Sequence, residues 1–255
     1  MDTNQIRVHS WLEHLAPPVL LFRMATMDKS RLEIMPNVWL DHRRAVFLEE
    51  YSVLAVADLH LGYAWAHRYN GQMLPIGGGD RILERLVDLC AFYKPKHFVF
   101  LGDIVHQAVP VAELVEDFNA VIGALAGHCE TKLIIGNHDK KLRTLLRGKE
   151  IELFPFVNVG RFLLLHGNSI PDGSEESIVI MGHEHPAISL GDGIKGARFP
   201  CFMVSERVLI LPAFSLWAAG GHCQAHTFMS PIAREAHFHK AVAICGNKLL
   251  PVKLN

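Results

Sequence analysis

Five short apolar runs in the sequence are followed by residue types that bind metal ions: Asp58 and His60, Asp103, Asn137 and His138, His166, and finally His183 and His185. In α/β proteins the carboxyl ends of parallel strands meet at one edge of a sheet, so loops that are distant in sequence converge there. Without a cation such a cluster would be costly, because carboxylates and imidazoles lose hydration and cannot all pair with one another. The pattern therefore predicts a metal centre.

The donor types indicate which ions would bind. The set combines carboxylate, imidazole and amide groups without a thiolate, and the chain as a whole has 16 histidines. Such donors suit Mn²⁺, Fe²⁺ or Zn²⁺, whereas Ca²⁺ and Mg²⁺ prefer oxygen-rich shells. The number of donors favours two ions, which binuclear hydrolases hold about 3.5–4 Å apart to clamp a phosphoryl group. Asp103 is central in the set and is the expected bridging carboxylate.

The elements that must position these residues alternate from residue 46 onward. Apolar runs at 53–57, 98–101 and 133–135 predict strands, and helical periodicity over 82–93 and 111–125 predicts covering helices, the first capped by Asp80 and the second ending before Gly127. After residue 160 strands dominate, at 162–165, 178–181, 199–204 and 208–211, with a hairpin around Gly246 and Asn247.

This order predicts an α/β fold in which two mixed β-sheets pack face to face with helices outside, a four-layer αββα sandwich. A single doubly wound sheet with a C-terminal hairpin is the alternative. Residues 1–30 break the rhythm and are expected to form an N-terminal extension, so that residues 31–255 make one domain.

The composition and charge of the chain indicate its cellular compartment and the classes of partner that it can bind. The formal net charge is -1 and the isoelectric point about 7.0, which gives no general attraction to nucleic acid or anionic membranes. Five scattered cysteines without a Cys-x-x-Cys pair indicate a reducing compartment. The apolar run 15–22 is broken by Pro17 and Pro18 and is too short to span a membrane. A cytoplasmic protein without a membrane partner is expected, and its oligomeric state stays open.

Two further segments near these motifs carry basic side chains. The segment 140–149 has an apolar stripe and several lysines and arginines, and it either guides an anionic substrate or is a solvated helix face. Arg68, Arg81 and Arg85 flank the glycine-rich loop 77–79, which could fold over the site.

Taken in order, the motifs resemble those of the calcineurin-like metallophosphoesterases. The family pattern runs D-x-H, G-D, G-N-H-[DE], H and G-H-x-H. This chain has the residues Asp58-Leu-His60, Gly102-Asp103, Gly136-Asn137-His138-Asp139, His166-Gly167 and Gly182-His183-Glu-His185. Any one element could arise by chance, but five in order are specific as a set.

The resemblance implies a role for each position. The first metal ion would be held by Asp58, His60, Asp103 and His185, and the second by Asp103, Asn137, His166 and His183. His138 would be no ligand but would face the phosphate, stabilising charge or protonating the leaving oxygen. Many members read G-D-x-x-D at the second motif, where this chain has His106. Asp139 is expected to cap the next helix or to hold an imidazole.

Other stretches resemble the DNA ligase-associated branch of this family: Ala57 to Gly62, Pro200 to Phe202, Leu211 to Phe214 and Gly220-Gly221. This resemblance spans roughly residues 30 to 240 and implies association with a DNA ligase, helicase or exonuclease. It does not indicate that DNA is the substrate.

The expected function is therefore a binuclear phosphodiesterase that acts by in-line attack of a metal-bridging hydroxide, with His138 and Asp103 as catalytic residues and Mn²⁺ as the preferred ion. The expected substrate is a small phosphate ester or a nucleotide. One alternative is a non-catalytic metal-bound subunit of a DNA-repair complex. A nuclease is another, although the net charge gives it little support.

Overall fold

The computed structural model describes residues 29–75, 79–107, 109, 111–139, 142, 152–173, 176–191, 196–218, 220–222 and 228–254. The expected extension over residues 1–30 lies almost wholly outside this set, and so does most of the basic segment 140–149. The division into an extension and one domain therefore stays a prediction.

The first sheet contains seven strands in sequence order. Its first four strands are joined antiparallel, and β4 to β7 run parallel to one another. The strands are β1 (Arg31–Met35), β2 (Val38–Asp41), β3 (Ala45–Leu48), β4 (Val53–Val56), β5 (His97–Leu101), β6 (Glu130–Ile134) and β7 (Leu153–Phe154).

The second sheet contains nine strands in the order β14-β11-β12-β13-β10-β9-β8, with β15 on β12 and β16 on β15. Strands β9, β10 and β13 are parallel. The strands are β8 (Phe156–Val159), β9 (Phe162–Leu165), β10 (Ile178–Met181), β11 (Pro186–Gly191), β12 (Gly196–Val204), β13 (Val208–Ile210), β14 (Gly221–His222), β15 (Lys240–Cys245) and β16 (Lys248–Lys253).

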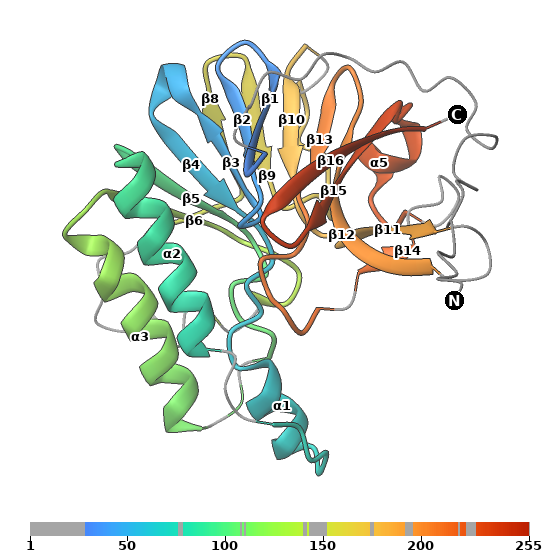
Figure 1. Cartoon of the computed structure of the whole chain (residues 1–255). Coiled ribbons are helices and arrows are strands. Elements are labelled where there is room, and N and C mark those ends of the chain that lie inside the picture. Colours follow the sequence, from blue (N-terminus) through green and yellow to red (C-terminus); the bar gives the residue numbers. More distant parts are fainter. Residues whose placement is uncertain are drawn as a thin grey trace, which may run out of the picture.

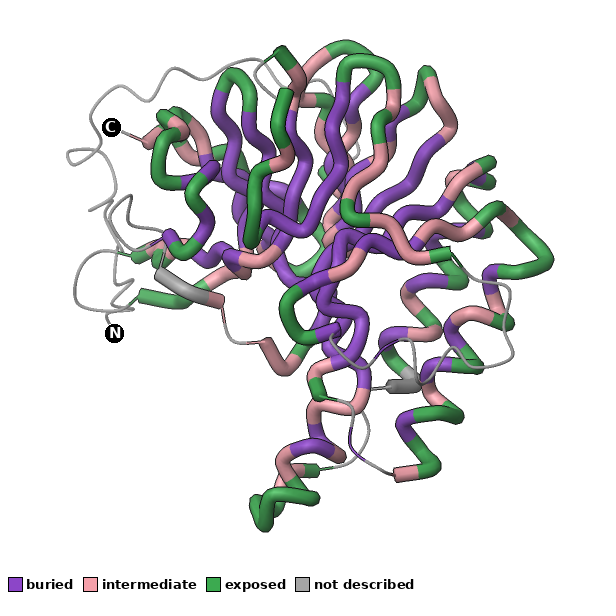
Figure 2. Tube along the Cα trace, turned by 180° about the vertical axis from the view of Figure 1, so that it is seen from behind, coloured by how far each residue is buried: buried purple, intermediate pink, exposed green. Residues whose placement is uncertain are grey.

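Helices α2 (Gly79–Tyr93) and α3 (Ala112–Ala126) cover the outer face of the first sheet, and the short α5 (Pro231–Glu235) lies on the second (Figure 1). A 3-10 turn, η1 (Glu49–Tyr51), precedes β4. Helix α1 (Tyr63–Tyr69) extends away from the sheets in both whole-chain views (Figures 1 and 2). None of the helices in these described segments is long and apolar enough to cross a membrane.

Three apolar cores separate the four layers, and the sheets carry most of the buried chain (Figure 2). Because side chains alternate across a strand, Phe162 and Leu164 of β9 enter the core between the sheets, whereas Leu163 and Leu165 enter the core under α5. In the same way Phe98 and Phe100 of β5 face α2 and α3. The four-layer αββα prediction is confirmed, and the single-sheet alternative is wrong.

Two sequence-based expectations need correction. The regular pattern begins at β1, well before residue 46. The sequence did not predict this edge strand, because its half-buried apolar side chains alternate with charged Arg31 and Glu33 and form no continuous apolar run. Helix α2 begins at Gly79, which places Asp80 in the first turn rather than at the cap. Helix α3 ends before Gly127, as predicted.

Candidate metal centre

The eight predicted site residues follow the carboxyl ends of β4, β5, β6, β9 and β10 and meet where the two sheets adjoin. An isolated parallel bridge between Ala57 and Ala213 joins β4 to the segment after β13 at this edge. The loops after β4 and β5 also run side by side, since the amide of His60 donates to the carbonyl of Asp103 at 2.9 Å. The predicted convergence is therefore present in the fold.

The backbone turns sharply at these strand ends. Five site residues have a positive φ: 56° at Asp58, 46° at His60, Asp103 and His185, and 72° at His183. This left-handed region is unfavourable for residues with a Cβ and is kept where the surrounding structure enforces it, commonly at functional sites. The sharp turns bring residues two apart, such as Asp58 and His60, toward the same centre.

The glycines of the motifs allow ligands from different loops to approach one another. A Cβ on Gly102 would lie 2.6 Å from His166 Nδ1, and one on Gly182 would lie 2.5 Å from Asp58 Oδ2. A Cβ on Gly136 would collide with the carboxylate of Asp103. Each glycine thus makes room for a ligand of another strand, which is why these positions exclude larger residues.

A first group of donors comprises Asp58, His60, Asp103 and His185, whose ligand atoms lie within 4.8 Å of one another. Nε2 of His60 lies 3.1 Å from Nε2 of His185, which in turn lies 3.5 Å from Asp58 Oδ1. Oδ2 of Asp103 faces the same group, at 3.9 Å from His60 Nε2. Asp58, His60 and Asp103 are buried.

A second group comprises Asp103, His166 and His183. Nε2 of His166 lies 3.1 Å from Nδ1 of His183 and 3.5 Å from Oδ1 of Asp103. The amide oxygen of Asn137 approaches the same nitrogen of His166, at 2.9 Å. The two oxygens of Asp103 therefore face the two groups, one each.

These contacts suit cations better than hydrogen bonds. Nδ1 of His166 lies 2.9 Å from the carbonyl of Leu101, so a neutral His166 carries its proton there and turns the lone pair of Nε2 toward the amide oxygen of Asn137, which cannot donate, and toward a ring nitrogen of His183. An ion bound at about 2.1 Å holds neighbouring donors about 3.0 Å apart in an octahedral shell and about 3.4 Å apart in a tetrahedral one. The observed separations fall near these values, so the residues fit two metal ions.

The pKa values follow from burial and from the carboxylates. Burial lowers the pKa of His60 to about 3, despite the nearby charge of Asp58, and burial also lowers the pKa of His183. Both rings are thus kept neutral, the form that binds metals. Burial alone would raise the pKa of Asp58, but hydrogen bonding and the charge of His185 lower it. His185 differs from His60 and His183, because burial would lower its pKa but its hydrogen bond to Asp58 and the charge of that carboxylate raise it.

The comparison with family profiles decides the family. The profile of the calcineurin-like phosphoesterases matches residues 51–203, which include all of the expected ligands. The chain belongs to this family. Membership implies divalent metal ions, for which the two donor groups sharing Asp103 are the candidate sites.

Two solved structures were compared with this chain. The nuclease MPE of Pseudomonas putida is 26% identical, with a TM-score of 0.61, over 87% of this chain and 98% of that one. A protein of unknown function from Aquifex aeolicus is 18% identical, with a TM-score of 0.35, over 52% of this chain and 78% of that one. A comparison with curated protein sequences gave no significant match.

His138 stands at the open side of the phosphoesterase centre. The side chain of His138 is 39% exposed, whereas that of Asp103 is 3% exposed. Nε2 of His138 lies 3.9 Å from Oδ2 of Asp103. Its Nδ1 lies 2.8 Å from the carbonyl oxygen of His106. The imidazole of His106 faces His60, with 3.4 Å between the two Nδ1 atoms, and burial lowers its pKa to about 4.

Two carboxylates near the centre position loops. Asp139 accepts hydrogen bonds from the amides of Gly136 at 2.9 Å and Val105 at 3.1 Å, so it ties the loop after β6 to the loop after β5. Of the two expected roles, these contacts give no support to holding an imidazole, and capping of the next helix stays a prediction because nearly all of 140–150 lies outside the described residues. Glu184, between the last two histidines, accepts from the amides of Met229 at 3.1 Å and Ser230 at 2.6 Å.

Sequence reasoning missed the positioning roles of Glu184 and of Arg85. The only local signal for Glu184 is a charged residue inside an otherwise apolar and histidine-rich segment. Arg85 is half-buried and donates to the carbonyls of Phe214 at 2.8 Å and Arg43 at 2.7 Å. The glycines Gly77 and Gly78 lie outside the described residues.

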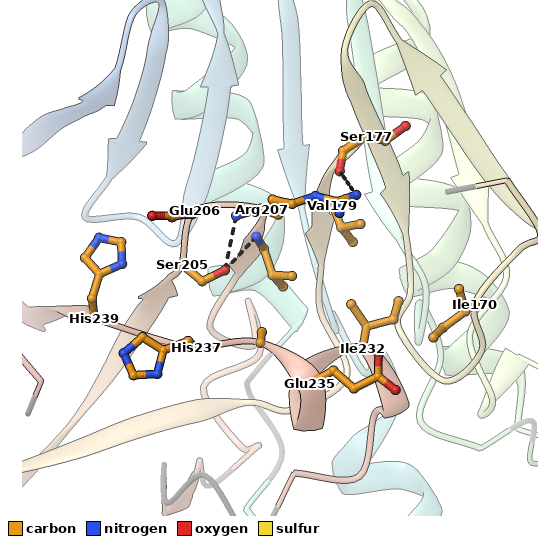
Figure 3. A pocket seen from close by; sticks show the side chains of 12 residues that line it. Ile170, Ser177, Val179, Ser205, Glu206, Arg207, Ile232, Glu235, His237 and His239 are labelled. Atoms are coloured by element: carbon orange, nitrogen blue, oxygen red, sulfur yellow. Dashed lines mark hydrogen bonds between the residues drawn. The ribbon is translucent and has the colours of Figure 1, made fainter. Parts of the chain in front are cut away.

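A large cavity of about 650 Å³ lies elsewhere and contains none of the metal-binding residues (Figure 3). It is lined by Ser177 and Val179 at the start of β10, together with His237 and His239. The metal centre follows the opposite end of β10, at His183. A smaller cavity of about 380 Å³ borders the centre at Gly136 and His166.

Proposed function

We propose that this chain is a binuclear metal-dependent phosphodiesterase. The observation that supports it most directly is the position of Asp103, whose two carboxylate oxygens face two separate groups of donors. In this proposal Asp58, His60 and His185 complete the first site, and Asn137, His166 and His183 complete the second. Mn²⁺ is the proposed ion, because the donors are a mixture of imidazole, carboxylate and amide without thiolate.

Bound divalent ions supply Lewis-acid activation of the phosphoryl group and of the attacking water. The chain's own residues then orient the ester and move a proton. His138 is exposed at the mouth of the centre, and its Nδ1 donates to a backbone carbonyl, so in the imidazolium form the second proton is on Nε2 and can pass to the leaving oxygen. The buried Asp58 and Asp103 hold their positions through backbone amides of His183 and His138.

We propose a diester rather than a monoester as the substrate because the similar Pseudomonas putida protein, MPE, is described as a nuclease, and nucleases cleave phosphodiesters. For the same reason a nuclease is the second candidate. A non-catalytic subunit is a weaker candidate, because the full set of donors and His138 are brought together.

The test is hydrolysis of bis-p-nitrophenyl phosphate, p-nitrophenyl phosphate and single-stranded DNA, each with Mn²⁺ and with a chelator. The proposal expects Mn²⁺-dependent release of p-nitrophenol from the diester and slower release from the monoester. Cleavage of DNA as well would establish the nuclease. Bound metal without turnover of any ester would favour the non-catalytic alternative.

The DNA-repair setting and the cytoplasmic location are also proposals. The stretches shared with the ligase-associated branch include Cys201, Leu211 and Phe214, which are fully buried and pack in the three apolar cores. They therefore support a common fold more directly than a common partner. Co-purification of the chain with a DNA ligase, helicase or exonuclease from its own cells tests the association.

A further inference from the structure

A row of aromatic and imidazole rings leads from helix α1 to the metal centre. The ring centroids of Tyr63 and His106 lie 4.5 Å apart, and those of His106 and His138 lie 5.3 Å apart with an interplanar angle of 22°. At the outer end the ring of Trp217 lies 6.4 Å from that of Tyr63, and the two are nearly parallel, at 6°. The row ends at His138, which faces the proposed site of the phosphate.

These outer rings are not part of the hydrophobic interior. Tyr63 and Trp217 are half-buried, and neither belongs to the three apolar cores formed by the described residues. Trp65, on the same helix, does pack against the core under α2 and α3. Aromatic side chains gain most from full burial, so two that stay partly in water beside a reaction centre indicate a surface for a ligand.

The segment that carries Trp217 is tied to the metal centre. The amide of Trp217 donates to Ser215 Oγ at 3.2 Å, and the amide of Ser215 donates to the carbonyl of Asp58 at 3.1 Å. Arg44 donates to the carbonyl of Ser215 at 2.5 Å, and Arg85 donates to the preceding carbonyl. The backbone that carries Trp217 is therefore held at a defined place relative to Asp58, which a stacking surface requires.

We propose that Tyr63 and Trp217 form a stacking platform for a base of a nucleotidyl ester whose phosphate lies at the metal centre. The inference rests on the proposed phosphodiesterase function and names its substrate class. A net charge of -1 gives no general attraction to a polyanion, so affinity for such a substrate must come from local contacts. Base stacking on aromatic rings is such a contact, and it tolerates any base because every base has a flat π face.

Binding to the metal-free protein tests the platform without catalysis. Fluorescence anisotropy would compare a labelled oligothymidylate with an abasic oligomer of the same length, for Tyr63→Leu and Trp217→Leu. Loss of one stacking contact should weaken binding of the base-bearing oligomer by about 5- to 100-fold. Binding of the abasic oligomer should change by less than about twofold, since its phosphates make the same ionic contacts.

Tyr69→Leu is the matched control, because Tyr69 lies on the same helix, is 61% exposed and is outside the row of rings. It should change neither affinity by more than about twofold. Retained metal content of all three variants on loading would show that the centre is intact. Hydrolysis by the loaded enzyme should then show a raised KM for the base-bearing oligomer in Tyr63→Leu, with kcat less affected.

The outcomes separate this inference from the proposed function. If no ester is hydrolysed but Tyr63→Leu still loses affinity for the base-bearing oligomer alone, the platform stands and the phosphodiesterase proposal fails. If diesters are hydrolysed but Tyr63→Leu binds like Tyr69→Leu, the platform is overturned. Equal affinity of the unsubstituted protein for the two oligomers, or binding of neither, also overturns it.

Discussion

The imidazole of His138 and the backbone carbonyl of His106 lie 2.8 Å apart, measured from Nδ1 to oxygen. A carbonyl only accepts, so this contact places a proton on Nδ1 and directs Nε2 toward Asp103, 3.9 Å away. The orientation of His138 is thus set by the main chain at position 106. The side chain there is free to contact His60 and Tyr63 instead.

His138→Ala should leave both metal ions bound, because its ring belongs to neither of the two donor groups that share Asp103 and forms a separate group with His60 and His106. Hydrolysis of a diester with a poor alkoxide leaving group should fall by about 10²–10⁴-fold, the usual loss for a general acid. A p-nitrophenyl diester should lose much less, because p-nitrophenolate leaves without a proton. The measurement is kcat for the two diesters, with metal analysis of the same preparation. Equal losses would instead assign charge stabilisation to His138, and loss of an ion would make it a ligand.

His106→Ala should weaken the metal site beside His60 while His138 keeps its orientation. Nδ1 of His106 lies 3.4 Å from Nδ1 of His60, and partners of this kind fix the ring of a metal-binding histidine. Their removal typically lowers metal affinity about 10- to 100-fold. Competition with a chelating indicator would measure it. His106→Asn offers an amide oxygen to the same nitrogen and should restore part of the affinity, and a variant with unchanged affinity would contradict this role.

Asp103→Asn should be the most damaging of the ligand substitutions. The amide keeps the shape of the side chain but removes the charge that both donor groups share, so both ions should bind weakly. Hydrolysis should fall by several orders of magnitude, and metal analysis should find less of both ions. A variant that keeps two ions and a near-normal rate would show that Asp103 is not the bridge.

Glu184→Gln should destabilise the loop that carries His183 and His185. A glutamine can accept from only one of the two amides, Met229 or Ser230, and turns its own donor toward the other. Loss of such a bond to a charged acceptor costs about 1.5–3 kcal/mol in the free energy of unfolding. Urea denaturation of the metal-free protein measures it. Glu235→Gln, at an exposed position, is the matched control and should differ little.

Asp41→Asn should remove a pH-dependent part of the stability that lies outside the metal centre. Burial would raise the pKa of Asp41, but hydrogen bonds and charge from Arg43, with the hydroxyl of Tyr93, lower it below the ordinary value of 3.8. A lowered folded-state pKa contributes stability above about pH 4 that is lost as the pH falls through it. The difference in unfolding free energy between the two proteins should therefore be largest near neutral pH and shrink toward pH 2. A constant difference would show that Asp41 is not ionised in the fold.

The sequence predicted which strands carry the chemistry, because strand ends and metal-binding residue types are local features. Phe162–Leu165 and Ile178–Met181 have the predicted bounds, and each is followed by a predicted ligand. Motif order was equally informative, since five short motifs retain their order whatever lengths of chain separate them. The edge strand β1 was missed because its half-buried apolar side chains alternate with charged ones and give no continuous apolar run.

Contacts between distant segments were beyond reach from the sequence. Glu184 accepts a hydrogen bond from the amide of Ser230, and Arg44 and Arg85 donate to carbonyls of the segment before Trp217. These bonds leave no local pattern, because each partner lies more than 40 positions away and is a backbone group, which any residue type has. The pairing of Tyr63 with Trp217 is of the same kind. The sequence alone determined the candidate metal ligands and the strands that they follow, since these depend on residue type and local periodicity. Only the tertiary structure decided which residues orient these side chains and their loops, because main-chain donors and acceptors have no sequence signature.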